Sequence, residues 1–437
     1  SPPRDDTSAG PDDEPSRGGE RSTAERGEPP AGGRERSSTS APSDQAERRG
    51  ATPVSSRGSV GGESAAGWLG TSTPPSTADT DSEPVCTEAH PASWSFGWGS
   101  FGVGVWPSVC WRPFSDRSPF NMTFAQLVGE GRLRPLANSQ AVVDRMMGER
   151  RAFIPLYAGY RYELGAQFYH PIYFSRPSDP LFTVTCTEQW GRCEVEGAQV
   201  RIPAQARPDC CVDKHMTVID QQTGWEYDFW GVEKTGPVGG GGTLRVRWGG
   251  MTRIDGDGLG SNATAAHFAL SAGIIRAQEL VAGRIEHGLF FGIDCSNGTY
   301  TWPAQGPGTG TPCSTPERRA ASAPLGAYIH LDMTPQQIDQ LPVPAWKKPI
   351  LKAMAKYGMW IGDTNGEGNG SGMLQFESGN TYTAFGHPDP IYQFAQQNRN
   401  QGGITYSPTE DAYYFDIQTG VDWQRYLRVY TVQPPSS

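Results

Sequence analysis

The stretch 209–230, which reads DCCVDKHMTVIDQQTGWEYDFW, decides the fold that we expect. Two runs of alternating character, 215–220 and 225–230, flank the polar join 221–224, which ends in Gly224. Successive side chains of a strand point to opposite faces, and glycine tolerates the positive φ that a tight turn requires. The stretch therefore predicts a β-hairpin.

The two faces of the predicted second strand differ in chemistry. One face is aromatic and carries Trp225, Tyr227 and Phe229. The other carries Glu226 and Asp228, together with Trp230. Burial of large rings is favourable, whereas burial of unpaired carboxylates is costly. We therefore expect the aromatic face in the core and the acidic face along a cleft or in open solvent.

Composition divides the chain unevenly. Trp68 is the only aromatic residue before position 86, and residues 1–85 are rich in Ser, Gly, Pro and charged side chains. Such a segment buries too little apolar surface to offset the entropy of ordering, so we expect a disordered tail over 1–85. The remainder, 86–437, is long enough for a single β-rich domain, which we expect to be monomeric.

Charge and hydropathy exclude two classes of partner. The formal net charge is −10 and no basic stripe is present, which argues against a nucleic-acid partner. No apolar run reaches the roughly 18 residues that a membrane span needs. The chain begins at Ser1 rather than Met, as it would after removal of an export signal, although a shortened chain would begin in the same way.

The cysteines indicate an oxidising compartment. There are eight, without a CxxC pair or zinc-type spacing: Cys86, Cys110, Cys186, Cys193, Cys210, Cys211, Cys295 and Cys313. An even count of this kind predicts disulfides and an extracellular protein. Short loops favour the pairs Cys86–Cys110, Cys186–Cys193 and Cys295–Cys313. Cys210 and Cys211 then either form a vicinal bridge or change these pairings.

The other segments predict many short strands and few helices. An amphipathic helix within 119–150 is expected to begin with Ser139 as its N-cap, and a long helix is expected over 261–283. Strand-forming runs elsewhere are separated by Gly and Pro. This pattern is typical of a mainly β protein, a jelly roll or β-sandwich of concanavalin-like type with a few inserted helices.

Several phrases resemble a group of secreted bacterial proteins, mostly from actinobacteria. They include RPFSDRSPFN, HPIYFSRPSDPLFTV, DKHMTVID, GWEYDFW, RIDGDGLGSNATAA, RIEHGLFF and VPAWKKPILKAMAKYGMWIGD. The resemblance covers about residues 110–430. It implies an exported protein of concanavalin-like or jelly-roll type, and it transfers no activity.

The carboxyl pair Glu226 and Asp228 is the first candidate for catalysis. Positions i and i+2 of a strand place the Cβ atoms about 6.5 Å apart on one face. Rotation of the side chains can bring the carboxyls to either separation used by glycosidases. WEYDFW is similar to the Glu-x-Asp-x-x-Glu strand of jelly-roll glucanases, but the third acid is replaced by Trp230 or Gly231. The alternative is an exposed face with solvated acids.

Two histidines that lie near acids in the sequence are further candidates. His215 follows Asp213 by two positions, and His287 follows Glu286 directly. A histidine beside a carboxylate is the usual pattern for an acid or base that acts near neutral pH. His287, however, alternates with apolar neighbours, so a buried structural histidine is the alternative there.

The expected function is that of a secreted glycoside hydrolase acting on an extracellular polysaccharide or cell-wall glycan. Trp225 or Trp230 would stack on sugar rings. A polysaccharide lyase is one alternative, in which Arg245 or Arg247 neutralises a uronate and His215 or Tyr227 abstracts the proton. A non-catalytic glycan-binding protein is the other.

No cofactor is expected. The oxygen-rich segment 363–369 resembles the first half of a calcium loop, but position twelve is Leu374 rather than Glu. A structural Ca²⁺ stays open beside the alternative of a Gly/Asn-rich hairpin. No other metal site is expected.

Overall fold

The computed structural model describes residues 101, 104–149, 151–159, 169–210, 213–306 and 310–436. The chain divides into two units, Ser1–Thr80 and Asp81–Ser437, and every described residue belongs to the second. The predicted tail over 1–85 therefore lies outside the described residues. Within these residues, none of the helices has the length and apolar character that crossing a bilayer takes.

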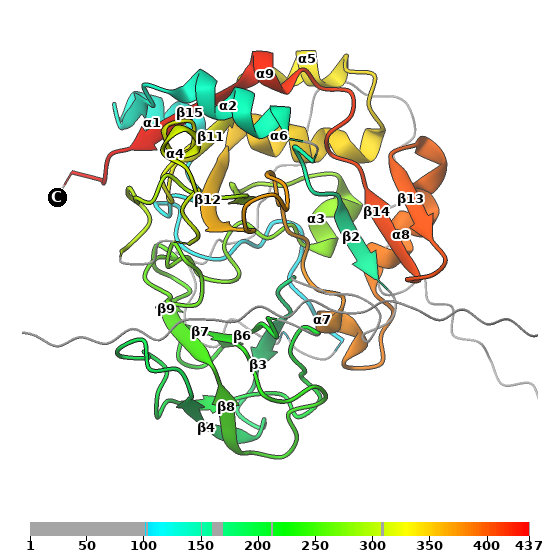
Figure 1. The fold of residues 1–437 in the computed structure, drawn as a ribbon. Coiled ribbons are helices and arrows are strands. Elements are labelled where there is room, and N and C mark those ends of the chain that lie inside the picture. The colour runs from blue at the N-terminus through cyan, green and yellow to red at the C-terminus, as the bar shows by residue number, and fades with distance from the viewer. Residues whose placement is uncertain are drawn as a thin grey trace, which may run out of the picture. The chain divides into compact units, whose positions relative to one another are not determined.

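A five-stranded sheet has the order β1-β15-β11-β12-β10 (Figure 1). Its strands are β1 Leu133–Pro135, β15 Leu427–Val432, β11 Tyr328–Leu331, β12 Met359–Thr364 and β10 Leu289–Ile293. β10 and β12 run parallel, and the other neighbours run antiparallel. The helices near this sheet are α1 Phe124–Gly129, α2 Ser139–Gly148, α5 Pro335–Asp339, α6 Lys348–Lys356 and α9 Trp423–Tyr426.

Two smaller sheets pack together around a second core. The first has the order β3-β6-β7-β9, with β3 Ile172–Ser175, β6 Met216–Asp220, β7 Trp225–Trp230 and β9 Trp248–Arg253. The second has the order β5-β4-β8, with β5 Gln199–Arg201, β4 Leu181–Cys186 and β8 Gly242–Val246. Both contribute to one apolar cluster, to which Val218, Phe229 and Leu244 belong.

A further sheet has the order β13-β14-β2 and packs against helix α8. These elements are β13 Ile404–Ser407, β14 Ala412–Phe415, β2 Leu156–Gly159 and α8 Pro390–Asn398. The remaining helices are α3 Ala277–Ala282, α4 Pro316–Ala320, α7 Asn380–Thr383, η3 Ala345–Lys347 and η4 Arg399–Gln401.

The sheet that contains the β6–β7 hairpin is covered on both faces. Tyr227 and Phe229 of β7 face the second core. Ile219, which pairs with Glu226 across the hairpin, belongs to the larger first core. Every residue of β6 is buried. The hairpin is therefore a middle layer, and its acidic face meets protein on the side where we had expected a cleft or solvent.

The mainly β character with inserted helices is confirmed, and so is the hairpin. β6 and β7 pair antiparallel in the expected register, with Thr217 opposite Asp228. Gly224 adopts a φ of 73° in the turn. The finer expectation of a jelly roll or a concanavalin-like sandwich remains a prediction.

The long helix predicted over 261–283 is wrong, because only Ala277–Ala282 is helical. The segment before α3 makes some of its backbone hydrogen bonds to distant parts of the chain. The N–H of Ala266 donates to the carbonyl of Gly362, and that of Ile275 donates to Gln375. Ser261 does not cap a helix, because its hydroxyl donates to Asp228 at 2.6 Å.

The helix predicted to start at Ser139 is confirmed as α2, Ser139–Gly148, with Asn138 rather than Ser139 at the N-cap. The hydroxyl of Ser139 instead accepts a hydrogen bond from the N–H of Val429 at 2.9 Å. This contact ties the start of α2 to β15.

Two predicted disulfides are confirmed, Cys186–Cys193 and Cys295–Cys313. Cys110 and Cys210 are also disulfide-bonded, and their partners lie outside the described residues. Cys86 and Cys211 lie outside the described residues, and so do the predicted pair Cys86–Cys110 and the alternatives for Cys211. No cysteine in the described part of the chain is free.

Candidate functional site

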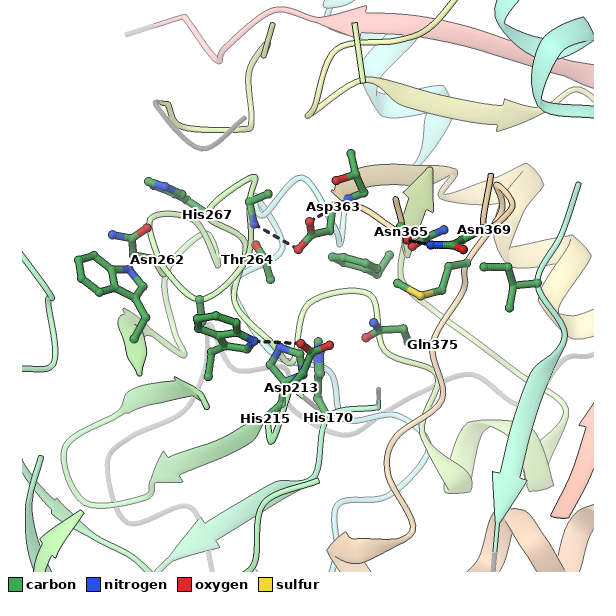
Figure 2. Close-up of a pocket in the computed structure, with 18 of the residues that line it drawn as sticks. His170, Asp213, His215, Asn262, Thr264, His267, Asp363, Asn365, Asn369 and Gln375 are labelled. Atoms are coloured by element: carbon green, nitrogen blue, oxygen red, sulfur yellow. Dashed lines mark hydrogen bonds between the residues drawn. The ribbon is translucent and has the colours of Figure 1, made fainter. Parts of the chain in front are cut away.

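A pocket of about 810 Å³ lies between the end of the hairpin sheet and the end of β12 (Figure 2). Its lining comes from segments far apart in the sequence: the approach to β6, the ends of β7 and β9, the loop 262–267, and the segment 363–375. Aromatic, amide, carboxyl and imidazole side chains meet there. This mixture of an apolar wall with a few polar groups is typical of a small-ligand site.

Three indoles form one wall of the pocket. Trp230 on β7 and Trp248 on β9 are register partners across the two strands. Trp190 packs on both, with its ring centroid 5.5 Å from each. The disulfide Cys186–Cys193 closes the loop that carries Trp190, and 61% of that residue is exposed. An exposed indole on a pocket wall offers a flat apolar surface to a ring-shaped ligand.

Asp213 connects the indole wall to a pair of histidines. Its Oδ1 accepts a hydrogen bond from Nε1 of Trp230 at 3.1 Å. Two residues later, the ring of His215 lies edge-on to that of His170, with centroids 4.5 Å apart. Figure 2 shows the three side chains together at one side of the pocket.

The two imidazoles are neutral at pH 7. Burial lowers the pKa of His215 to about 3. Burial, and then the neighbouring His215, hold the pKa of His170 well below its usual range. Nδ1 of His170 donates to the carbonyl oxygen of Leu270 at 2.7 Å, so its Nε2 is left as an acceptor. Nδ1 of His215 has no partner among the described residues.

A β-bulge in β12 places Asp363 at the pocket. Phe291 pairs with Ile361, but the next residue, Gly292, pairs with Asp363, so Gly362 is an extra residue in β12. A side chain at 362 does not fit, because a Cβ there would lie 2.1 Å from the ring of Phe290. Bulges of this kind redirect the following side chain, often beside a functional site.

The Asp363 carboxyl is partly desolvated, and its hydrogen-bond donors are backbone N–H groups. It accepts hydrogen bonds from the N–H of Thr364 at 2.8 Å and of Ala265 at 3.3 Å. Burial raises its pKa to about 6, and the negative charge of Asp213 adds to that rise. A carboxyl group with this pKa is protonated in a substantial fraction of molecules near pH 6, as a general acid requires.

Amide side chains complete the lining. The Asn365 Nδ2 donates to Gly370, and Asn369 Nδ2 donates to the carbonyl of Asn365. In contrast, Oδ1 of Asn365 and Oε1 of Gln375 are buried without a hydrogen-bond partner in the described structure. Both are acceptors, so they favour a ligand that carries donors.

The loop 363–369 makes pocket and surface contacts of its own. Glu367 accepts hydrogen bonds from Ser314 at 2.7 Å and pairs with Arg318.

Among the described residues, no group of three or more His, Cys, Asp and Glu is arranged to hold a metal ion.

The expectation that Glu226 and Asp228 line a cleft or solvent is wrong. Both residues are 0% exposed, and neither lines the pocket. Glu226 accepts hydrogen bonds from the N–H and hydroxyl of Ser271 at 3.0 and 2.6 Å. Asp228 accepts from the hydroxyls of Ser261 and Thr217 at 2.6 and 3.0 Å. These donors replace water, which is why burial of the pair is tolerated.

The other predicted site residues divide between the pocket and its surroundings. His215 and Trp230 line the pocket, whereas Trp225, Tyr227, Arg245, Arg247 and His287 do not. His287 is buried, with Nε2 3.1 Å from Glu279.

Three of the residues outside the lining already have partners on or near the surface. Arg245 and Arg247 pair with Glu233 and Glu188. Trp225 lies under the guanidinium of Arg253, 5.3 Å from the ring centroid.

Sequence reasoning did not find His170 or Trp190, and it assigned Asp213 and Asp363 no catalytic role. A weak signal existed for Trp190, which is the only aromatic residue in the short loop between Cys186 and Cys193. His170 carries no such signal, because its partner His215 is 45 positions away and meets it only through the parallel pairing of β3 with β6.

Compared with known proteins, the chain matches no family model, no curated protein and no solved structure at a significant level.

Proposed function

We propose that this protein is a secreted glycoside hydrolase whose active centre is the pocket between Trp190, Asp213 and Asp363. One observation carries the proposal: an exposed indole wall borders the same pocket as two carboxyl groups. Indole faces suit the apolar faces of sugar rings, and paired carboxyls are the usual catalytic groups of glycosidases. The disulfides support an oxidising compartment.

In this proposal Asp363 is the general acid. Its burial and raised pKa keep a proton available for transfer to the glycosidic oxygen as the bond breaks. Asp213 is the second carboxyl, and it either attacks the anomeric carbon or takes a proton from the attacking water. The neighbouring imidazoles are neutral, so they form no ion pair that would compete for the Asp213 carboxylate.

Hydrolysis is proposed in preference to lyase chemistry because of the charges around the pocket. A lyase that acts on a uronate needs a cation to neutralise the sugar carboxylate. The described lining contains no Arg or Lys. Arg245 and Arg247, the candidates from sequence, already pair with Glu233 and Glu188.

The test is a panel of polysaccharides scored for new reducing ends and for the absorbance of unsaturated products. Asp363→Asn and Asp213→Asn are each expected to lower kcat by at least about 100-fold, the usual contribution of an acid or base. Asp389→Asn is the matched control, because burial also raises its pKa to about 6 at the start of α8. That variant should keep full activity.

Trp190→Ala tests the indole wall. It should raise KM with a smaller effect on kcat, whereas Tyr300→Ala, which removes a similarly exposed ring outside the pocket, should change neither. Full activity of Asp363→Asn on a cleaved glycan would place the chemistry elsewhere. Glycan binding without any product would assign the pocket to a non-catalytic binding protein.

A further inference from the structure

The charged side chains among the described residues that line the pocket are acidic. Asp213 and Asp363 both line it, and among the described lining residues there is no Arg or Lys to balance them. Trp230 provides a single N–H to Asp213, and two backbone N–H groups serve Asp363. Among the described residues, neither carboxyl has a cationic side chain as a hydrogen-bond partner.

Two amide oxygens of the lining also lack hydrogen-bond partners among the described residues. Gln375 is only 3% exposed, and its Oε1 has no partner among the described residues. Asn365 Oδ1 likewise has no hydrogen-bond partner among the described residues. Figure 2 shows the Gln375 side chain directed into the pocket, on the side that faces Asp213 and the histidines. A buried acceptor without a donor is unfavourable, so these atoms call for a ligand rich in donors.

His170 also presents an acceptor nitrogen. His170 uses its one proton on the carbonyl of Leu270, so its second nitrogen is an acceptor. Burial keeps both His170 and His215 uncharged near neutral pH, and they therefore do not neutralise the carboxylates. Carboxylates, amide oxygens and imidazole nitrogen together form an acceptor-rich lining.

We infer that the pocket selects a glycan unit that carries a free amino group, a cationic amino sugar, with its ammonium held near Asp213, Asp363 and Gln375. An ammonium supplies three donors together with the positive charge that the lining lacks. The hydroxyls of a neutral sugar supply donors without a positive charge. A uronate would place a further negative charge beside the acidic side chains of the pocket. The inference rests on the proposed function, because it names the substrate class of the same site.

The test compares binding of four oligosaccharides of equal length by titration calorimetry at pH 6 and low ionic strength. They are a glucosamine oligomer, its N-acetylated form, a cello-oligosaccharide and an oligogalacturonate. The glucosamine oligomer should bind at least about tenfold more tightly than the N-acetylated one, and the difference should shrink as salt is added. The oligogalacturonate should bind most weakly.

Asp213→Asn is the decisive variant, because it keeps an oxygen that can accept from Trp230 and removes only the charge. It should reduce the preference for glucosamine to less than about threefold, as expected when one of two nearby charges is lost. Glu233→Gln removes a charge from an exposed acid outside the pocket lining and should leave the preference unchanged. Trp190→Ala should weaken all bound oligosaccharides by a similar factor.

The outcomes separate this inference from the function on which it rests. Equal affinity for the glucosamine and N-acetylated oligomers, or a preference that survives Asp213→Asn, would overturn the amino-sugar inference while a Trp190-dependent glycan site remains. Absence of Trp190-dependent binding to any of the four oligosaccharides would overturn both.

Discussion

Glu226 and Asp228 lie two positions apart on the same face of β7, and both side chains are completely excluded from solvent. Burial, and then the negative charge of Asp228, hold the pKa of Glu226 well above its usual range. Glu226 is therefore the member of the pair that we expect to hold a proton. The pair closes the interface between the hairpin sheet and the segment 261–271.

This assignment predicts opposite effects for two isosteric substitutions. Glu226→Gln keeps this side chain uncharged and should leave the free energy of unfolding at pH 7 unchanged or higher. Asp228→Asn leaves one acceptor oxygen for Ser261, Thr217 and Leu270, and should cost about 1 to 3 kcal/mol. Urea unfolding of both variants measures the difference. Equal losses would contradict the assignment of the proton.

The same pair predicts a pH dependence of stability. The folded-state pKa of Glu226 is raised above its unfolded value, so its contribution is fully present below about pH 4.3 and is lost as pH rises toward the folded-state pKa. The difference in melting temperature, wild type minus Glu226→Gln, should therefore fall steadily from pH 4 to pH 8. A difference that does not vary with pH would remove Glu226 as its source.

The bulge in β12 predicts that Gly362 is needed for both stability and activity. Gly362→Ala forces a Cβ against the ring of Phe290 and should cost about 1 to 3 kcal/mol. The displaced Asp363 should also lower glycan cleavage. Gly236→Ala is the control, because a Cβ there has no atom within 4 Å and should change stability by less than about 0.5 kcal/mol. Thermal unfolding and activity assays report both effects.

The two disulfides should differ in their effect on glycan binding, because only Cys186–Cys193 closes the loop that carries Trp190. Replacing both Cys186 and Cys193 by Ala should lower stability by about 2 to 3 kcal/mol and also weaken glycan binding, because Trp190 is no longer held against the pocket. Replacing both Cys295 and Cys313 should cost about 3 kcal/mol without a change in affinity. Equal affinity in both double variants would show that the loop does not position Trp190.

The proposed role of Asp363 predicts the alkaline limb of the activity profile. A general acid must be protonated, and burial raises the pKa of Asp363 to about 6. kcat/KM should therefore fall about tenfold per pH unit above that value. Asp389→Asn should keep the same limb, because Asp389 caps α8 and does not line the pocket. A profile that stays flat to pH 9 would exclude Asp363 as the acid.

Local sequence pattern correctly predicted the elements that pair with segments close to them in the sequence. The hairpin β6–β7 follows from alternation and a glycine turn, and two disulfides follow from short loops. It failed over 261–283, because a helical spacing of apolar residues cannot reveal that Ser261 binds Asp228 on β7 and that Ile275 binds Gln375, both far away in the sequence.

The sequence by itself determined that β7 has an aromatic face and an acidic face; only the tertiary structure decided that both are buried. The reason is that the hairpin sheet lies between two cores, so the acids meet Ser261 and Ser271 rather than solvent. The pocket depends on tertiary structure even more. His170, Trp190 and Asp363 reach it from separate elements, through a parallel strand pairing, a disulfide loop and a β-bulge. The meeting of these three side chains at one pocket is a long-range arrangement, and no periodicity within a single segment encodes it.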